Sequence, residues 1–198
     1  MSNLVNKLKK RRSYREFETE SFDIQLLIDA IEAAKHAPNG ANKQPWTFCI
    51  IKNPKIKKQI RIQSELIESE FYENISETWQ SDLNHLSVNT NKPFLEQAPY
   101  LIAIFKHTYQ FDQKGNRTNV YYPDISIGIA TGMLISVLTD YGLDILTYTP
   151  SPNQFLGDIL KRPKNEKPYL LIACGKGSKT YKLPNISKKT NEEIIKIY

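Results

Sequence analysis

The stretch APNGANKQPWTF, residues 37–48, joins a helix to a buried strand through a polar loop. Upstream, residues 23–36 carry apolar side chains at helical spacing, and Asp23 can cap the start of that helix. Downstream, WTFCIIK predicts a strand that ends before Asn53-Pro54. The loop can present backbone and amide groups to the edge of a heterocycle, although an ordinary helix–strand connection has the same composition.

A second polar stretch, RRSYREF at residues 11–17, follows a short helix predicted over residues 4–12. Guanidinium groups bind phosphate oxygens with bidentate geometry, and a serine hydroxyl adds a donor. An arginine can also face the electron-rich end of a flavin, where a cation raises the reduction potential. A solvated basic helix end has the same composition. This stretch alone therefore does not distinguish a binding site for phosphate or flavin from an ordinary surface segment.

Helical and strand patterns alternate through the rest of the chain, which predicts a single domain over residues 1–198. In the most apolar helix, Gly128 and Gly132 would let another backbone approach closely. A lysine-rich tail has no core of its own and is expected to pack on a partner. We predict helices over residues 55–85, 122–141 and 153–160, strands over 98–106, 144–149 and 167–174, a turn-rich loop over 109–119, and the tail over 178–198.

The composition is that of a globular domain with a hydrophobic core, at 40% hydrophobic and 24% charged residues. Cys49 and Cys174 lie in apolar segments and cannot form a disulfide framework, so we expect a reducing, cytoplasmic location. We expect no association with a membrane, because no secretory signal is visible and the longest apolar run is too short and polar to span a bilayer.

The net charge of +6 is spread along the chain, which suits a solvated surface or a general attraction for anions. No nucleic-acid-binding motif is visible, and none of the P-loop, Gly-x-Ser-x-Gly or Rossmann patterns occurs. His36, His85 and His107 lack the spacing of metal ligands, so no metal site is expected.

Taken together, the motifs resemble the nitroreductase family. The resemblance rests on the two polar stretches above, on EQAP at residues 96–99 before a strand, on the glycine-containing helix, and on LKRPKNEKPYLLIACGKG near the end, and it covers nearly the whole chain. It implies an α+β fold with a central, mostly antiparallel sheet flanked by helices, an intertwined homodimer, and FMN bound at the dimer interface.

Within that family, the segments YYPDISIGIATGML and TYTP look like the iodotyrosine deiodinase branch. Members of this branch bind the amino-acid head of the substrate with a Glu, a Tyr and a Lys carried on a mobile lid. Glu68, Tyr72 and Lys92 occupy those places, and we expect the lid over roughly residues 66–93. The spacing of Glu68 and Tyr72 puts both on one face of a helix. Glutamate suits an ammonium group and lysine a carboxylate, but both residues are also common on any solvated helix.

The resemblance also implies flavin-binding positions. Thr149 matches a threonine that donates to flavin N5 and favours one-electron chemistry, while Ala41 matches a position near the substrate. Asn39 stands where these relatives often have serine, and Lys188 replaces a phosphate-binding arginine, which loses the bidentate fork. The implied cofactor-binding residues are Arg11, Arg12, Ser13, Tyr14, Arg15, Asn39, Gly40, Thr147, Tyr148, Thr149 and Lys188, with Asn39 and Gly40 reaching the flavin of the other subunit.

We therefore expect an FMN-dependent oxidoreductase that removes halogen from halotyrosines, with NAD(P)H as the source of electrons. One alternative is a general NAD(P)H-dependent nitroreductase or quinone reductase acting on small aromatic substrates. Another is a flavin-binding or sensing protein without turnover, and the last is a basic surface-binding module without a cofactor.

Overall fold

A four-stranded antiparallel sheet forms the centre of the computed structural model, which describes residues 3–198 except 74, 85 and 87. The strand order is β1-β2-β6-β5, so the chain crosses from the first two strands to the far edge before it returns to the centre. The strands are β1 (Trp46–Ile51), β2 (Tyr100–His107), β5 (Asp144–Tyr148) and β6 (Glu166–Gly175). The predicted α+β class and antiparallel sheet are confirmed.

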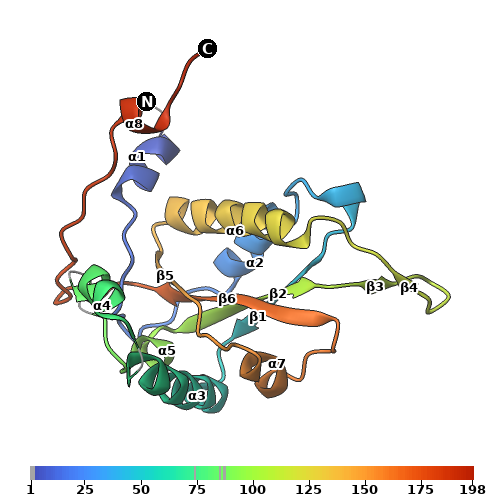
Figure 1. The fold of residues 1–198 in the computed structure, drawn as a ribbon, viewed down its shortest axis with the longest axis horizontal. Coiled ribbons are helices and arrows are strands. Elements are labelled where there is room, and N and C mark those ends of the chain that lie inside the picture. Colours follow the sequence, from blue (N-terminus) through green and yellow to red (C-terminus); the bar gives the residue numbers. More distant parts are fainter. Residues whose placement is uncertain (1–2, 74, 85, 87) are drawn as a thin grey trace.

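Helices cover both faces of the sheet (Figure 1). Alternation along β2 sends Ile102 and Ile104 to one face and Leu101 and Phe105 to the other, and all four are buried. The first face is covered by α2 (Gln25–Ala34) and α6 (Pro123–Asp140), and the second by α3 (Pro54–Glu73), α5 (Phe94–Gln97) and α7 (Phe155–Ile159). Two apolar cores therefore hold the sheet rigid between them.

Most predicted elements lie where the sequence places them, but the sequence analysis predicts neither α5 nor α8 (Asn191–Ile194), and other segments differ as well. Residues 109–119 are not only a loop, because they contain a hairpin of β3 (Gln110–Phe111) and β4 (Arg117–Thr118). Its turn is closed by Asp112, whose carboxylate accepts hydrogen bonds from the backbone of Lys114 and Asn116. The helix expected over residues 55–85 is divided into α3 and α4 (Glu77–Asn84). Around the two glycines of α6, the only described atom outside the helix within 4 Å of a built Cβ is the Tyr169 hydroxyl beside Gly128, so the close approach of another backbone stays a prediction.

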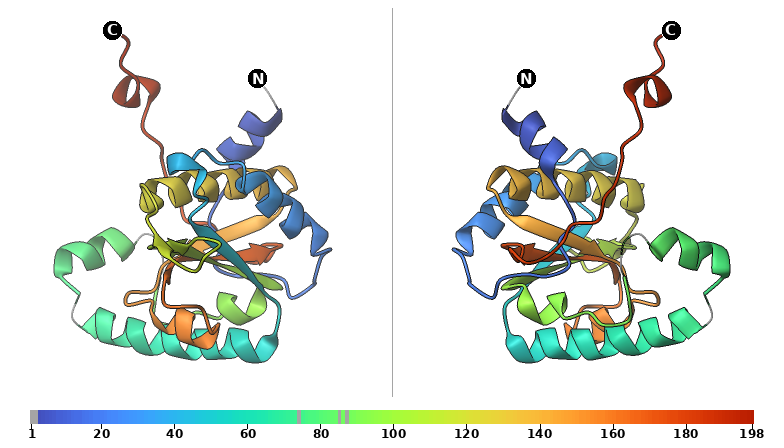
Figure 2. Two further views of the ribbon diagram at one scale, coloured as in Figure 1. Left: turned by 90° about the vertical axis from the view of Figure 1, so that its right-hand side faces the viewer. Right: turned by 90° about the vertical axis from the view of Figure 1, so that its left-hand side faces the viewer.

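Both ends of the chain lie on the α2–α6 side. The first helix, α1 (Asn3–Lys10), contacts α6, where Lys7 Nζ lies 2.9 Å from the Asp140 carboxylate. Figure 2 shows the C-terminal tail projecting from the body, with the short helix α8 (Asn191–Ile194) near its end. Tyr181 and Pro184 contact the body of the protomer, whereas residues 185–198 are all exposed. No described helix is long and apolar enough to cross a membrane.

Candidate active site

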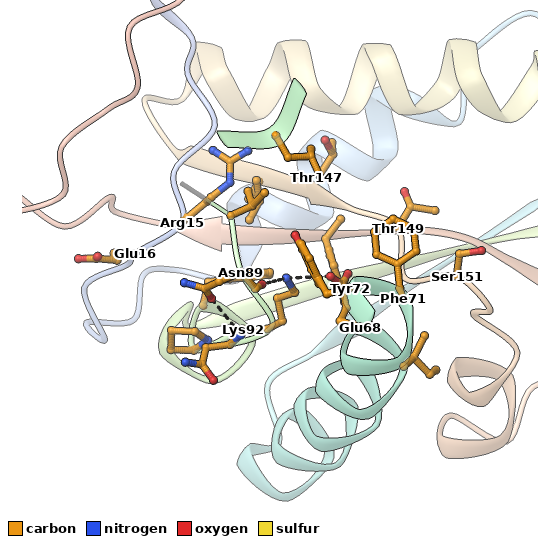
Figure 3. Close-up of a pocket in the computed structure, with 18 of the residues that line it drawn as sticks. Arg15, Glu16, Glu68, Phe71, Tyr72, Asn89, Lys92, Thr147, Thr149 and Ser151 are labelled. Carbon is orange, nitrogen blue, oxygen red and sulfur yellow. Dashed lines mark hydrogen bonds and ion pairs between the residues drawn. The ribbon is translucent and has the colours of Figure 1, made fainter. Parts of the chain in front are cut away.

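A cavity of about 550 Å³ opens between the C-terminal half of α3, the segment before α5, and the end of β5. The predicted head-group residues Glu68, Tyr72 and Lys92 all line it (Figure 3). Glu68 and Tyr72 lie one helical turn apart on α3, as their spacing predicts. Lys92 comes from the segment that leads into α5, so the cavity joins two parts of the chain that are separated in sequence.

Glu68 and Lys92 form an ion pair in this cavity. Lys92 Nζ lies 3.0 Å from Glu68 Oε2. The Lys92 side chain is 6% exposed and the Glu68 side chain is 16% exposed. The ammonium group also donates to the carbonyl oxygen of Asn89 and lies 5.7 Å from the ring centre of Tyr72. The low exposure reduces screening by water, so the pair is a strong local dipole facing the cavity.

The carboxylate of Glu68 has a second partner in Tyr148. The Tyr148 hydroxyl donates a hydrogen bond to Glu68 Oε1 at 3.1 Å. Burial, and then the negative charge of Glu68, raise the pKa of Tyr148 far above its ordinary value. The same two causes raise the pKa of Tyr72. Both phenols therefore stay protonated at neutral pH and remain available as donors.

The backbone at Lys92 is fixed by a chain of charged groups on α3 and α5. The backbone amide of Lys92 donates to Glu65 Oε1 at 2.7 Å, and Arg61 Nε donates to the same oxygen at 2.8 Å. Burial alone would raise the pKa of Glu65, but the bonds from Lys92 and Arg61 lower it. Arg61 also bonds to Glu96 of α5 at 3.0 Å. These contacts position Lys92 before any ligand arrives.

The end of β5 supplies the opposite wall. Thr147 and Thr149 line the cavity and are exposed, and Arg15 lines it beside them. Arg15 reaches this place because the segment before it runs along β5, with Ser13 paired to Ile145 and the Tyr14 amide donating to the Ile145 carbonyl at 3.2 Å. Hydroxyl and guanidinium donors therefore gather at one strand end.

Apolar residues that the sequence analysis did not single out complete the cavity. Phe71 and Trp79 stack edge to face with ring centres 4.8 Å apart, and Phe94 packs in the same way on Tyr148 at 5.4 Å. In the sequence, the signal for this apolar wall is that Phe71 stands directly before Tyr72, which was already a predicted site residue. Such a wall suits the ring of an aromatic ligand.

Several predicted positions lie outside the cavity in this protomer. Arg12 donates to the carbonyl of Pro184, and Tyr14 packs on Gly177 and Tyr181. Arg11 and Ser13 belong to the segment beside β5, while Lys188 is exposed in the tail. The residues of the predicted set that do not line the cavity are Arg11, Arg12, Ser13, Tyr14, Asn39, Gly40, Ala41 and Lys188.

The loop that carries Asn39, Gly40 and Ala41 has strained backbone. Ala41, Asn42 and Gln44 all have positive φ, at 51°, 52° and 47°. A side chain at Gly40 would collide with the Tyr121 carbonyl oxygen, 2.7 Å from the position of its Cβ. Strain of this kind is concentrated at functional sites, and it is kept only where the surroundings enforce it.

A separate polar cluster lies at the opposite end of the sheet from the cavity wall. Glu166 is buried and accepts two hydrogen bonds from Arg162, at 2.7 and 2.8 Å, and one from Thr47 at 3.0 Å. Burial by itself raises the pKa of Glu166, but the bonds from Arg162 and Thr47 lower it. Burial lowers the pKa of the neighbouring His107. Among the described residues, no three acidic, His or Cys side chains gather as metal ligands would.

Comparisons with known proteins agree with this architecture. A model of the nitroreductase family matches residues 8–176. The chain is 39% identical over 189 residues to an iodotyrosine deiodinase of Haliscomenobacter hydrossis, which covers 95% of this chain and 85% of that protein. It is 35% identical over 193 residues to the iodotyrosine deiodinase of Nematostella vectensis, and that alignment covers 95% of this chain and 72% of the other protein.

A crystal structure of oxidised iodotyrosine deiodinase bound to FMN and 3-iodo-L-tyrosine superposes with a TM-score of 0.84. The two sequences are 30% identical, and the alignment covers 98% of each chain. The sequence and structure comparisons thus span most of the chain and agree with each other. The chain belongs to the nitroreductase family, in its iodotyrosine deiodinase-like branch.

Proposed function

We propose that this protein is an FMN-dependent oxidoreductase that removes halogen reductively from halotyrosines. The observation that carries the proposal is the ion pair of the partly exposed Glu68 and the buried Lys92, an acid and a base 3.0 Å apart in the wall of an aromatic-lined cavity. An amino acid carries an ammonium and a carboxylate on one carbon, and the two protein charges complement them. The solved relative with the same fold binds both FMN and 3-iodo-L-tyrosine.

The residues at the end of β5 fit a flavin. Thr147, Thr149 and Arg15 present hydroxyl and guanidinium donors to the cavity, and a flavin ring has nitrogen and carbonyl acceptors along its edge. Arg15 would bear on the ring and Thr149 on N5, while Arg11, Ser13 and Lys188 would hold the phosphate. When bound, FMN would supply the two electrons that, with a proton, replace a carbon–halogen bond by a carbon–hydrogen bond and release halide.

The protein's own residues bind and orient the substrate. Glu68 takes the ammonium group, Lys92 the carboxylate, and Tyr72 adds a hydroxyl donor. Phe71 and Trp79 enclose the aromatic ring and exclude water, which strengthens each charged contact. We propose that the segment of roughly residues 66–93 acts as the lid, because its two ends carry the residues that meet over the cavity.

We propose a homodimer as the functional unit. Asn39 and Gly40, which the resemblance assigns to the flavin of the other subunit, do not line the cavity of their own protomer. Apolar surface supports this arrangement, since Tyr122, Ile125 and Ile129 at the start of α6 are 73%, 64% and 40% exposed. The projecting tail could bury its exposed isoleucines on the partner.

We also propose that NAD(P)H is the ultimate electron source, directly or through a reductase. The net charge of +6 supports an encounter with an anionic dinucleotide. A reducing cytoplasmic location is proposed as well, and it is supported by the two free cysteines, Cys49 and Cys174.

The test is titration of FMN-loaded protein with 3-iodo-L-tyrosine, read by flavin fluorescence, followed by dithionite-driven turnover with detection of iodide. The proposal requires binding and iodide release by the wild type, loss of binding in Lys92→Ala, and unchanged binding in Lys58→Ala, which alters an exposed lysine of α3 outside the cavity. No iodotyrosine affinity, combined with equal NAD(P)H-driven turnover of nitroaromatics by wild type and Lys92→Ala, would establish a general reductase instead.

A further inference from the structure

Tyr148 connects the strand that carries the flavin-facing threonines with the lid. Alternation along β5 turns Thr147 to one face and Tyr148 to the other, where its ring packs on Phe94. From there its hydroxyl reaches Glu68 Oε1 at 3.1 Å. The resemblance to known relatives gave Tyr148 only a place beside the flavin, so this contact is a property of the tertiary structure.

The two oxygens of the Glu68 carboxylate have different partners. Oε1 accepts from the neutral Tyr148 hydroxyl, and Oε2 faces the charged Lys92 ammonium group at 3.0 Å. Only the second partner competes with a substrate. For an amino acid to enter, its ammonium must replace Lys92 at Oε2, and Lys92 must turn to the substrate's carboxylate.

Tyr148 need not move during that exchange. It is a donor without charge, so it does not repel the incoming ammonium, and its ring is held by Phe94. Burial raises the pKa of Tyr148, which keeps the hydroxyl protonated. The carboxylate therefore retains one fixed hydrogen bond while its other oxygen changes partner.

We propose that Tyr148 is a positioning residue that holds the Glu68 carboxylate in place for the ammonium group of the substrate. The inference rests on the proposed function, since it concerns recognition of the same amino-acid head. It assigns to this chain a fourth head-group determinant, which acts through Glu68 rather than by touching the substrate. Its effect is confined to ligands that carry an α-ammonium group.

The experiment is calorimetric titration of FMN-loaded wild type, Tyr148→Phe, Glu68→Gln and the double variant. The ligands are 3-iodo-L-tyrosine and 2-iodophenol, which has the ring and halogen but no head. Tyr148→Phe keeps the ring that packs on Phe94, so the fold is retained. Tyr141→Phe, which removes a hydroxyl from an exposed tyrosine at the C-terminal end of α6, is the matched control.

We expect Tyr148→Phe to weaken binding of iodotyrosine roughly tenfold or more, as for loss of a hydrogen bond to a charged group. Binding of iodophenol should change less than twofold. In the Glu68→Gln background the same substitution should have little further effect on iodotyrosine. In steady-state turnover, KM should rise while kcat stays near the wild-type value, which a merely structural role for Tyr148 would not produce.

Each outcome separates the two proposals. If wild type binds iodotyrosine but Tyr148→Phe binds it equally well, the role of Tyr148 is refuted and the proposed function stands. Equal losses for iodotyrosine and iodophenol would also refute it, because the defect would then lie in the cavity as a whole. A wild-type protein without iodotyrosine affinity would refute the proposed function, and this inference with it.

Discussion

The ion pair between Glu68 and Lys92 should hold the proposed lid closed, and Lys92→Met tests this directly. The substitution removes the ammonium group but keeps an unbranched, apolar side chain of similar length. Glu68 would then remain as a carboxylate that is only 16% exposed, with the Tyr148 hydroxyl as its remaining partner among the contacts described above. We therefore expect the closed arrangement to become less stable.

The geometry sets the size of the effect. Opposite charges 3.0 Å apart attract by about 5.5 kcal/mol at an effective dielectric constant of about 20, and desolvation of both groups offsets much of this. Breaking a fully buried pair costs about 3–5 kcal/mol. Because Glu68 keeps its bond to Tyr148 and some access to water, we expect about 2–3 kcal/mol, or roughly 30- to 150-fold more open lid.

Chymotrypsin provides the assay, because Phe71 and Tyr72 are sites for this protease within the proposed lid and both are partly buried against the cavity. The cleavage rate at these sites, followed by mass spectrometry without added substrate, reports the open population when opening is fast. Global melting should change far less, because the core beneath α3, which includes the fully buried Ile60, is untouched. Lys58→Met is the control on the exposed side of the same helix.

A double-mutant cycle makes the reasoning refutable. Glu68→Gln combined with Lys92→Met leaves no uncompensated charge, so cleavage of the double variant should return to within a few-fold of wild type. If Lys92→Met is cleaved within threefold of wild type, the pair does not close the lid. If the double variant is cleaved as fast as Lys92→Met alone, the two charges are not coupled.

Three further predictions follow from the other contacts. Thr149→Ala should lower dithionite-driven release of iodide at least tenfold while iodotyrosine affinity changes less than threefold, and Thr149→Ser should restore turnover; loss of affinity instead would place Thr149 in substrate binding. Ile125→Glu should shift the protein toward monomer in sedimentation, and an unchanged oligomer would exclude this face from the dimer interface. Glu166→Gln should reduce the free energy of unfolding at pH 7 by about 1–3 kcal/mol. Burial alone would raise the pKa of Glu166, but the bonds from Arg162 and Thr47 hold it below its ordinary value of 4.5. The ionised Glu166 therefore stabilises the fold above pH 4.5, and this stabilisation is lost as the pH falls through the pKa of the folded state. Urea unfolding at pH 7 and at about pH 3 should therefore show the difference shrinking, and a constant difference would contradict it.

Local patterns in the sequence determined much of the fold. Continuous apolar runs predicted the four central strands, because helices cover both faces of the sheet and the strands bury side chains on both. The i, i+4 spacing placed Glu68 and Tyr72 on one helical face without knowledge of the rest of the chain. The hairpin over residues 110–118 was missed, because its strands are two residues long and bury no apolar stripe.

The tertiary structure alone decided which distant residues meet. Lys92 pairs with Glu68 because Arg61 and Glu65 fix the backbone where the lid rejoins the body, and no local pattern encodes a contact across that distance. Tyr148 reaches the same carboxylate because its side chain leaves β5 on the face of the sheet that α3 covers. The charge and spacing of residues can be read from a sequence. Which distant side chains come into contact depends on how the sheet and helices pack, and that packing is a property of the whole chain.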